Sequence, residues 1–214
     1  MYSIVAVTDA SPDGRDELVV TGPRYSLRYA APGDASRLLE IASNPAVTRW
    51  FSWGPYTDIS QPESYIASLP ARREAGELLD FVIVDADDLP VGVTGLSEVA
   101  RRDRRATVGS WLGQRWWGSG ANAEAKAMIA ALAFRRLGFD RLTAWANTRN
   151  GRSQRALERV GFRREGVLAG WHRHGEDVHD VVIFGLLRAA WEHGPLHDVP
   201  VTISGTPPSA FVMA

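Results

Sequence analysis

The sequence predicts one mixed α/β or α+β domain, and three observations support this. Short apolar runs alternate with helical patterns in the order β-α-α-β-β-β-α-β-α-β-β. Short turns join the strands in the middle of the chain, as in antiparallel hairpins, whereas a helix separates the strands at 106–112 and 141–146, as in a parallel crossover. No linker interrupts residues 24–187. A mixed, mostly antiparallel sheet in a single domain is therefore expected.

The first half of the domain begins at a strand and a helix. Pro32-Gly33-Asp34 is typical of a helix start, with Asp34 as the cap and Leu38 and Ile41 on the apolar side. Pro62 suits the first turn of a second helix. The elements expected in this half are a strand at 25–29, a helix from about 34, a loop at 44–61, a helix at 62–75, and strands at 80–85, 90–99 and 106–112.

The second half follows the same logic. A long Ala-rich helix places Ala127, Ala131 and Phe134 on one face and ends at Gly138. Asn150 is the expected cap of the next helix. The later elements are a strand at 141–146, a helix at 151–160, and strands at 162–171 and 178–187 around Gly175. We expect an N-terminal extension at 1–23, a domain at 24–188 and a C-terminal tail at 189–214.

The composition excludes several classes of function. A net charge of −1 provides no general attraction to nucleic acid or an anionic membrane. The absence of cysteine excludes disulfides, thiolate metal sites and a cysteine nucleophile. The N-terminus lacks the pattern of a signal peptide and no apolar run has transmembrane length, so we expect a cytoplasmic protein. All five His lie between 172 and 197, but a hairpin would scatter them, and no metal site is expected.

The most informative segment follows the strand at 106–112. Gly118 and Gly120 allow a sharp turn and a close approach of the backbone to a ligand. The first amides of the following helix have no internal partners, which favours a phosphate or pyrophosphate. Arg115 adds a positive charge beside this turn. These residues predict a cofactor that carries a pyrophosphate.

Two common phosphate-binding motifs fit poorly. Gly118-x-Gly120-x-x-Ala123 matches the dinucleotide fingerprint, but it lies in mid-chain after a hairpin, and the next strand ends without the expected acidic residue. A nucleoside-triphosphate loop needs Gly-Lys-Ser/Thr, which the chain lacks. An oxidoreductase that binds a dinucleotide remains only as a rival interpretation.

Arg115-x-x-Gly118-x-Gly120 resembles the Q/R-x-x-G-x-G/A acyl-CoA motif of the GCN5-related N-acetyltransferase (GNAT) superfamily. Other segments resemble the ribosomal-protein-alanine acetyltransferase (RimJ/RimL) branch in order and spacing: 25–28, 33–35, 117–125, 150–153, 158–162, 163–168 and 175–180. The resemblance covers about residues 24–188. It implies a GNAT-like domain with a splayed sheet, about four helices, and acetyl-CoA between the strands at 106–112 and 141–146.

The resemblance also implies where the cofactor lies. Its pyrophosphate would contact the amides of 116–121, its pantetheine arm would follow 109–112, and Asn150 and Ser153 would face the thiol. An amide near Trp111 or Leu112 would be the oxyanion donor. The cofactor-binding residues expected on this basis are Trp111, Leu112, Arg115, Trp116, Trp117, Gly118, Ser119, Gly120, Ala121, Asn150 and Ser153.

Acyl transfer from a thioester to an amine needs a base, an oxyanion donor and a thiolate leaving group. Many relatives have a Tyr acid four residues before the Gly-Phe pair, but this chain has Leu157 there, so Ser153 is the expected hydrogen-bond donor to sulfur. Glu98 and His172 are the candidate bases. Direct attack by the amine, with ordered water in place of a base, remains an alternative.

The acceptor is expected to be a protein or peptide N-terminus or a small amine. Trp50, Trp53 and Tyr56 lie in an aromatic loop that predicts either an acceptor pocket or simple packing. Neither a nucleic acid nor a membrane is expected as a partner, and relatives suggest a homodimer. Besides the dinucleotide-binding oxidoreductase, two rivals remain: the same fold with another acyl donor such as succinyl-CoA, and a non-catalytic acyl-CoA-binding regulatory protein.

Overall fold

The computed structural model describes residues 17–213. They contain a nine-stranded sheet in the order β7-β8-β6-β5-β4-β3-β2-β1-β9. The strands are β1 (Val19–Thr21), β2 (Ser26–Arg28), β3 (Leu78–Val84), β4 (Pro90–Ala100), β5 (Arg105–Leu112), β6 (Arg141–Asn147), β7 (Arg163–His174), β8 (Asp177–Leu187) and β9 (Thr202–Ser204). The α-helices are α1 (Ala35–Ala42), α2 (Pro45–Thr48), α3 (Ser60–Glu74), α4 (Ala121–Ala131), α5 (Gly151–Arg159) and α6 (Arg188–Trp191).

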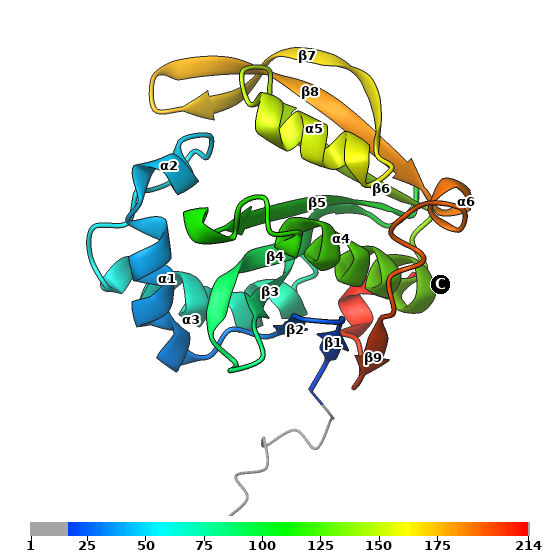
Figure 1. Cartoon of the computed structure of the whole chain (residues 1–214), viewed down its shortest axis with the longest axis horizontal. Helices are drawn as coiled ribbons and strands as arrows, with labels where there is room; N and C mark the ends of the chain where they lie inside the picture. The colour runs from blue at the N-terminus through cyan, green and yellow to red at the C-terminus, as the bar shows by residue number, and fades with distance from the viewer. Residues whose placement is uncertain (1–16, 214) are drawn as a thin grey trace, which may run out of the picture.

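Every neighbouring pair of strands is antiparallel except β5 and β6, so the expected mixed, mostly antiparallel sheet is confirmed. In Figure 1, β7, β8 and α5 are at the top and β1, β2 and β9 at the bottom, with β5 between them. The strand order therefore puts the single parallel contact in the middle of the molecule.

This parallel contact is short. The paired residues of β5 and β6 are Arg105 with Arg141, Ala106 with Leu142, and Thr107 with Thr143. Beyond them the two strands are not paired, although β5 remains paired with β4 as far as Leu112 and β6 with β8 as far as Asn147. The sheet is therefore splayed between β5 and β6, and the second half of β5 has a free edge.

The two faces of the sheet are covered by different helices. Along β5, Ala106, Val108 and Leu112 belong to the main core, which includes α4. Trp111 belongs instead to a smaller cluster with residues of α1 and α3. Because side chains alternate along a strand, Thr107 and Gly109 lie on the same face as Trp111. The gap between β5 and β6 therefore opens onto two faces of the sheet, one covered by α4 and the other by α1 and α3.

Several local expectations were wrong. The loop at 44–61 contains the short helix α2, because Asn44 accepts a hydrogen bond from the Ala46 amide at 2.9 Å and caps it. Asp34 occupies the expected N-cap position of α1, but its side chain does not cap the helix; it pairs with Arg28 and accepts from the Ala31 amide. The described residues contain six α-helices instead of about four, and a π-helical segment, Leu132–Leu137, continues α4.

Both ends of the described chain join this fold. β1 pairs with β2 on one side and with β9 on the other, although residues 1–23 were expected to be peripheral. After β8, Trp191 and Phe211 are buried in the main core. Their large apolar surfaces explain why the segment after 188 packs against the domain. None of the helices in residues 17–213 has the length and hydropathy of a membrane span.

Candidate active site

The turn between β5 and α4 has the backbone that its glycines predict. Gly118 has φ +79° and Gly120 has φ +91°, values that L side chains rarely adopt. A Cβ on Gly118 would meet no heavy atom within 4 Å, so the space above this glycine is open. The Gly120 conformation ends the turn immediately before Ala121, the first residue of α4. Open space therefore lies above Gly118, whereas the Arg24 guanidinium lies beside Gly120 at the start of α4.

Aromatic and basic side chains hold this turn in place. The Trp117 indole donates to the Leu112 carbonyl oxygen at 2.9 Å and so ties the turn to the end of β5. The Arg152 guanidinium of α5 lies over the Trp117 ring, 3.2 Å from its centroid. Arg115 lies over Trp116, 4.2 Å from that centroid, and remains exposed. These contacts bring α5 and the turn together across the splay.

Helix α5 begins as its sequence predicts. Asn150 accepts a hydrogen bond from the Ser153 amide at 3.2 Å and caps the helix. Ser153 is partly buried in the first turn, and Leu157 is buried one turn later. Leu157 therefore contributes to packing, and Ser153 remains the candidate donor on this helix.

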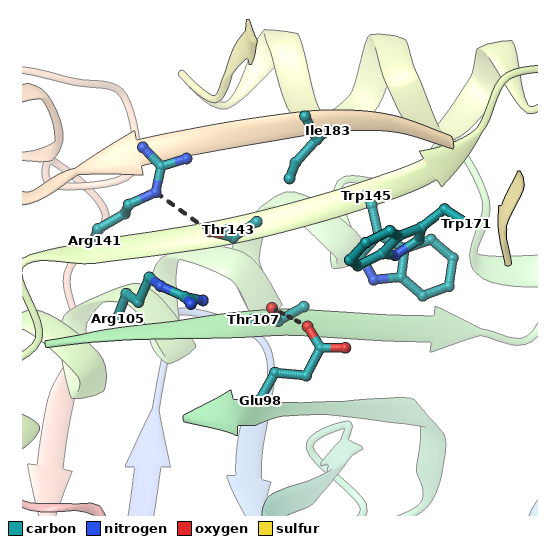
Figure 2. A pocket seen from close by; sticks show the side chains of 8 residues that line it. All are labelled: Glu98, Arg105, Thr107, Arg141, Thr143, Trp145, Trp171 and Ile183. Carbon is teal, nitrogen blue, oxygen red and sulfur yellow. Dashed lines mark hydrogen bonds between the residues drawn. The ribbon is translucent and has the colours of Figure 1, made fainter. Parts of the chain in front are cut away.

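A cavity of about 310 Å³ lies at the paired end of the splay, on the α1/α3 face (Figure 2). Its lining combines two arginines, a carboxylate and two indoles: Glu98, Arg105, Thr107, Arg141, Thr143, Trp145, Trp171 and Ile183. Glu98 has φ +49° at a β-bulge in β4, which turns its side chain toward β5. The Thr107 hydroxyl donates to Glu98 Oε2 at 2.7 Å.

The other candidate base, His172, adjoins this cavity without lining it. Its ring lies 4.8 Å from the Trp145 ring, and its Nε2 is buried without a hydrogen-bond partner. Burial, with smaller contributions from His174 and His179, lowers the pKa of His172. The imidazole is therefore largely neutral near pH 7, as a base must be.

The aromatic loop divides into two parts. Trp53 packs against Phe51, Tyr56 and Trp111, with ring centroids 5.2, 5.2 and 5.7 Å away, so this part of the loop contacts β5. Trp50 instead lies under the Arg49 guanidinium. None of the three aromatics predicted for the acceptor pocket lines the 310 Å³ cavity. The structure places Trp53 between Tyr56 and Trp111, and Trp50 forms a cation–π contact with Arg49.

Sequence reasoning missed several polar residues near the splay. On β5 and β6, polar residues alternate with apolar ones, a period-two signal from which these residues could have been predicted: Arg105, Thr107, Arg141 and Thr143. Asp80 stands in the apolar run Leu78–Val84, and Lys126 in the Ala-rich helix α4. Both are polar exceptions in apolar elements, which was the only signal the sequence offered for them.

Comparison with known proteins agrees with this geometry. The family model "Acetyltransferase (GNAT) domain" matches residues 24–163, more than half of the chain. The chain belongs to the GNAT acetyltransferase family. This confirms the expected fold and an N-acyltransferase with an acyl-CoA as its cosubstrate.

The relatives include N-acetyltransferases that span most of the chain. The "Uncharacterized N-acetyltransferase p20" of Bacillus licheniformis is 30% identical over 77% of this chain and 93% of its own length. The "[Ribosomal protein uS5]-alanine N-acetyltransferase" of Escherichia coli is 29% identical over 82% of this chain and 93% of its own. Among solved structures, Mycobacterium smegmatis RimJ in complex with CoA-disulfide has a TM-score of 0.75 and 24% identity, over 84% of this chain and 91% of that one.

Proposed function

We propose that this protein transfers an acetyl group from acetyl-CoA to the primary amine of a protein N-terminus or a small molecule. The observation that carries the proposal is the free edge of β5, which leads from the paired end of the splay to the glycine turn and the N-terminus of α4. A free strand edge suits the amides of a pantetheine arm, and helix amides suit a pyrophosphate. The spacing of these two features along one strand matches an acyl-CoA.

In this proposal the reaction is a direct attack in a ternary complex. Within residues 116–121, the Gly118 and Gly120 amides donate to no described residue, and they hold the pyrophosphate with help from Arg115. The other four amides of this segment already donate within the turn. Residues 109–112 pair with the pantetheine arm. A backbone amide at Trp111 or Leu112 donates to the oxyanion, and Ser153 donates to the departing sulfur, with Asn150 holding its turn. Glu98 and His172 are the candidate bases that the sequence offers for the proton of the amine.

The acceptor is proposed on two grounds. The ribosomal-protein specificity named for the E. coli relative supports an N-terminal α-amino group. Trp53, packed against Trp111 of β5, and Tyr56, packed on Trp53, support an apolar or aromatic group beside that amine. The reaction is proposed for the cytoplasm. Trp171, Val167 and Val178 are about half exposed on the β7–β8 hairpin, which supports a homodimer that sedimentation would reveal.

Calorimetry on the purified protein tests the cofactor. Acetyl-CoA, succinyl-CoA, CoA and NADH are titrated in turn, and we expect micromolar binding of acetyl-CoA without binding of NADH. Tighter binding of succinyl-CoA would transfer the proposal to that acyl group. Binding of acyl-CoA without turnover on a broad panel of peptides and amines would favour a regulatory protein. No binding of any CoA compound would overturn the proposal.

A further inference from the structure

A row of three residues crosses the sheet beside the splay. Asp80 of β3 is the register partner of Gly95 in β4, and Gly95 is the partner of Gly109 in β5. Partners in adjacent strands lie side by side on the same face, about 4.8 Å apart. This is the α1/α3 face, since Asp80 contacts Tyr65 of α3. The row therefore leads from the Asp80 carboxylate to the free half of β5.

The two glycines give this row its shape. A Cβ on Gly95 would overlap Asp80 Oδ1, so the carboxylate lies directly over this glycine. A Cβ on Gly109 would meet nothing within 4 Å. The Asp80 carboxylate thus reaches one strand toward β5, and the space above Gly109 is open beside it. A ligand atom in that space would lie between the carboxylate and the free edge of β5.

One oxygen of Asp80 is held and the other is available. The Tyr65 hydroxyl donates to Oδ2 at 2.7 Å, and no described residue donates a hydrogen bond to Oδ1. Burial raises the pKa of Asp80 to about 6, against the opposing effects of Tyr65 and Arg72. A partly buried carboxylate with one unsatisfied oxygen is a suitable partner for a cation or a transferable proton.

Aromatic rings are close to the open space. Trp111 follows Gly109 by two residues and lies on the same face. The Trp53 ring meets Trp111 edge-on, and Tyr56 packs on Trp53. An ammonium group is attracted both to a carboxylate and to the faces of indole and phenol rings. The surroundings of Gly109 therefore combine the two groups that recognise an organic ammonium ion.

The geometry points to Asp80 as the residue that binds the acceptor's primary ammonium group above Gly109 and takes its proton, an inference that rests on the function proposed above. The acceptor class is a primary amine on an unhindered carbon with an apolar or aromatic body, which packs on Trp53 and Trp111. Glu98 is less suited to this role, because it is exposed and already accepts a hydrogen bond from Thr107.

The proton balance is simple. Asp80 takes one proton from the ammonium ion, and the neutral amine attacks the thioester carbonyl carbon. The new C–N bond forms, the C–S bond breaks, and the electron pair leaves with sulfur. The nitrogen loses its second proton to that sulfur by way of Ser153, and Asp80 releases its own proton to solvent. The products are the amide, CoA and one proton.

Binding of a simple amine tests this site without knowledge of the natural acceptor. The probe is 2-phenylethylamine, titrated at pH 8 into the protein saturated with CoA, and the control ligand is 2-phenylethanol, which lacks the charge. We expect the amine to bind at least tenfold more tightly than the alcohol, and Asp80→Asn to remove this preference. Asp87→Asn, in the turn that follows β3, is the matched control and should keep it.

The pH dependence gives a second readout, which also serves if Asp80→Asn folds poorly. The groups that face Asp80 are Tyr65 and Arg72 of α3, with Tyr56 near Tyr65. In the wild type, amine binding should weaken as pH falls through about 6, because Asp80 becomes protonated. The Tyr65 hydrogen bond favours the charged carboxylate, so Tyr65→Phe should move this transition to higher pH.

The outcomes separate the two proposals. If CoA binds but the wild type does not prefer the amine to the alcohol, or if Asp80→Asn keeps the preference, the assignment of Asp80 is overturned and the acyl-CoA function stands. An amine transition that Tyr65→Phe leaves unmoved would also contradict it. If the wild type binds no CoA compound, the proposed function itself fails.

Discussion

Replacing Lys126 by Met should stabilise the protein at neutral pH. Lys126 is the only lysine in the chain and the only basic residue among those described that is buried. Its Nζ donates to Ser110 Oγ at 2.7 Å and to Asn122 Oδ1 at 3.0 Å. No described carboxylate forms an ion pair with it. A charge is thus held in the interior by two neutral oxygens.

The magnitude follows from the pKa. Burial lowers the pKa of Lys126 from 10.5 to about 8. At about 1.36 kcal/mol per pKa unit, the buried charged form costs about 3 kcal/mol relative to a solvated lysine. The two hydrogen bonds return about 1 kcal/mol each, and Met fills a similar volume without a charge. We therefore expect Lys126→Met to raise the free energy of unfolding by about 1 to 2 kcal/mol at pH 7.

The sign of the pH dependence is a further check. Between pH 8 and 10.5 the unfolded chain binds more protons at this lysine than the folded protein does, so wild-type stability rises with pH in that window. Below pH 8 both states are protonated, and the full cost of the charge is present. Lys126→Met lacks this rise, so its advantage at pH 7 should shrink by about 3 kcal/mol at pH 10 and reverse.

Urea denaturation of both proteins at pH 7 and pH 10 measures these differences. Arg155→Met, on the exposed side of α5, is the control for replacing a cation by Met and should show little change with pH. Equal differences between Lys126→Met and the wild type at the two pH values would refute the reasoning, because they would mean that the buried amine keeps an ordinary pKa.

Two further predictions concern the proposed cofactor site. Gly120→Glu should abolish CoA binding in calorimetry, because a carboxylate would enter the pyrophosphate space. The control is Gly175→Glu, which carries the same positive-φ strain in the β7–β8 turn and should bind CoA normally. Unchanged CoA affinity in Gly120→Glu would remove the motif assignment. Ser153→Ala should lower turnover about tenfold with little change in acetyl-CoA affinity, since a thiol with a pKa of about 8.5 leaves readily. If Ser153→Ala keeps the turnover of the wild type in stopped assays, Ser153 has only a structural role in α5.

The order of the elements was predictable because local patterns specify it. Alternation along β5 and β6, the glycines before α4 and the Asn150 cap are all signals within a few residues. The short helix α2 was not predicted because four residues are too few to show a helical periodicity in the sequence. Strands β1 and β9 were not predicted because each is three residues long and is stabilised by pairing with the other.

The site was only partly predictable for a different reason. The glycine turn and Ser153 belong to contiguous motifs, and the resemblance to the GNAT family pointed to them. Asp80 depends on Tyr65, fifteen residues earlier, and on glycines in two other strands. Lys126 depends on Ser110, sixteen residues away on β5. The chemistry of such residues is set by tertiary contacts, which a linear pattern does not encode.

The brief pairing of β5 with β6 also has a mechanical consequence. Within residues 17–213, one block of sheet runs from β9 to β5 and another from β6 to β7, and three residue pairs form the only ladder between them. Such blocks are expected to open as separate cooperative units at a lower free energy than global unfolding. A cofactor bound along the free edge of β5 would join the two blocks as an additional strand does. Amide hydrogen exchange near Thr107 and Thr143 should then slow on binding, so that the substrate completes the sheet that binds it.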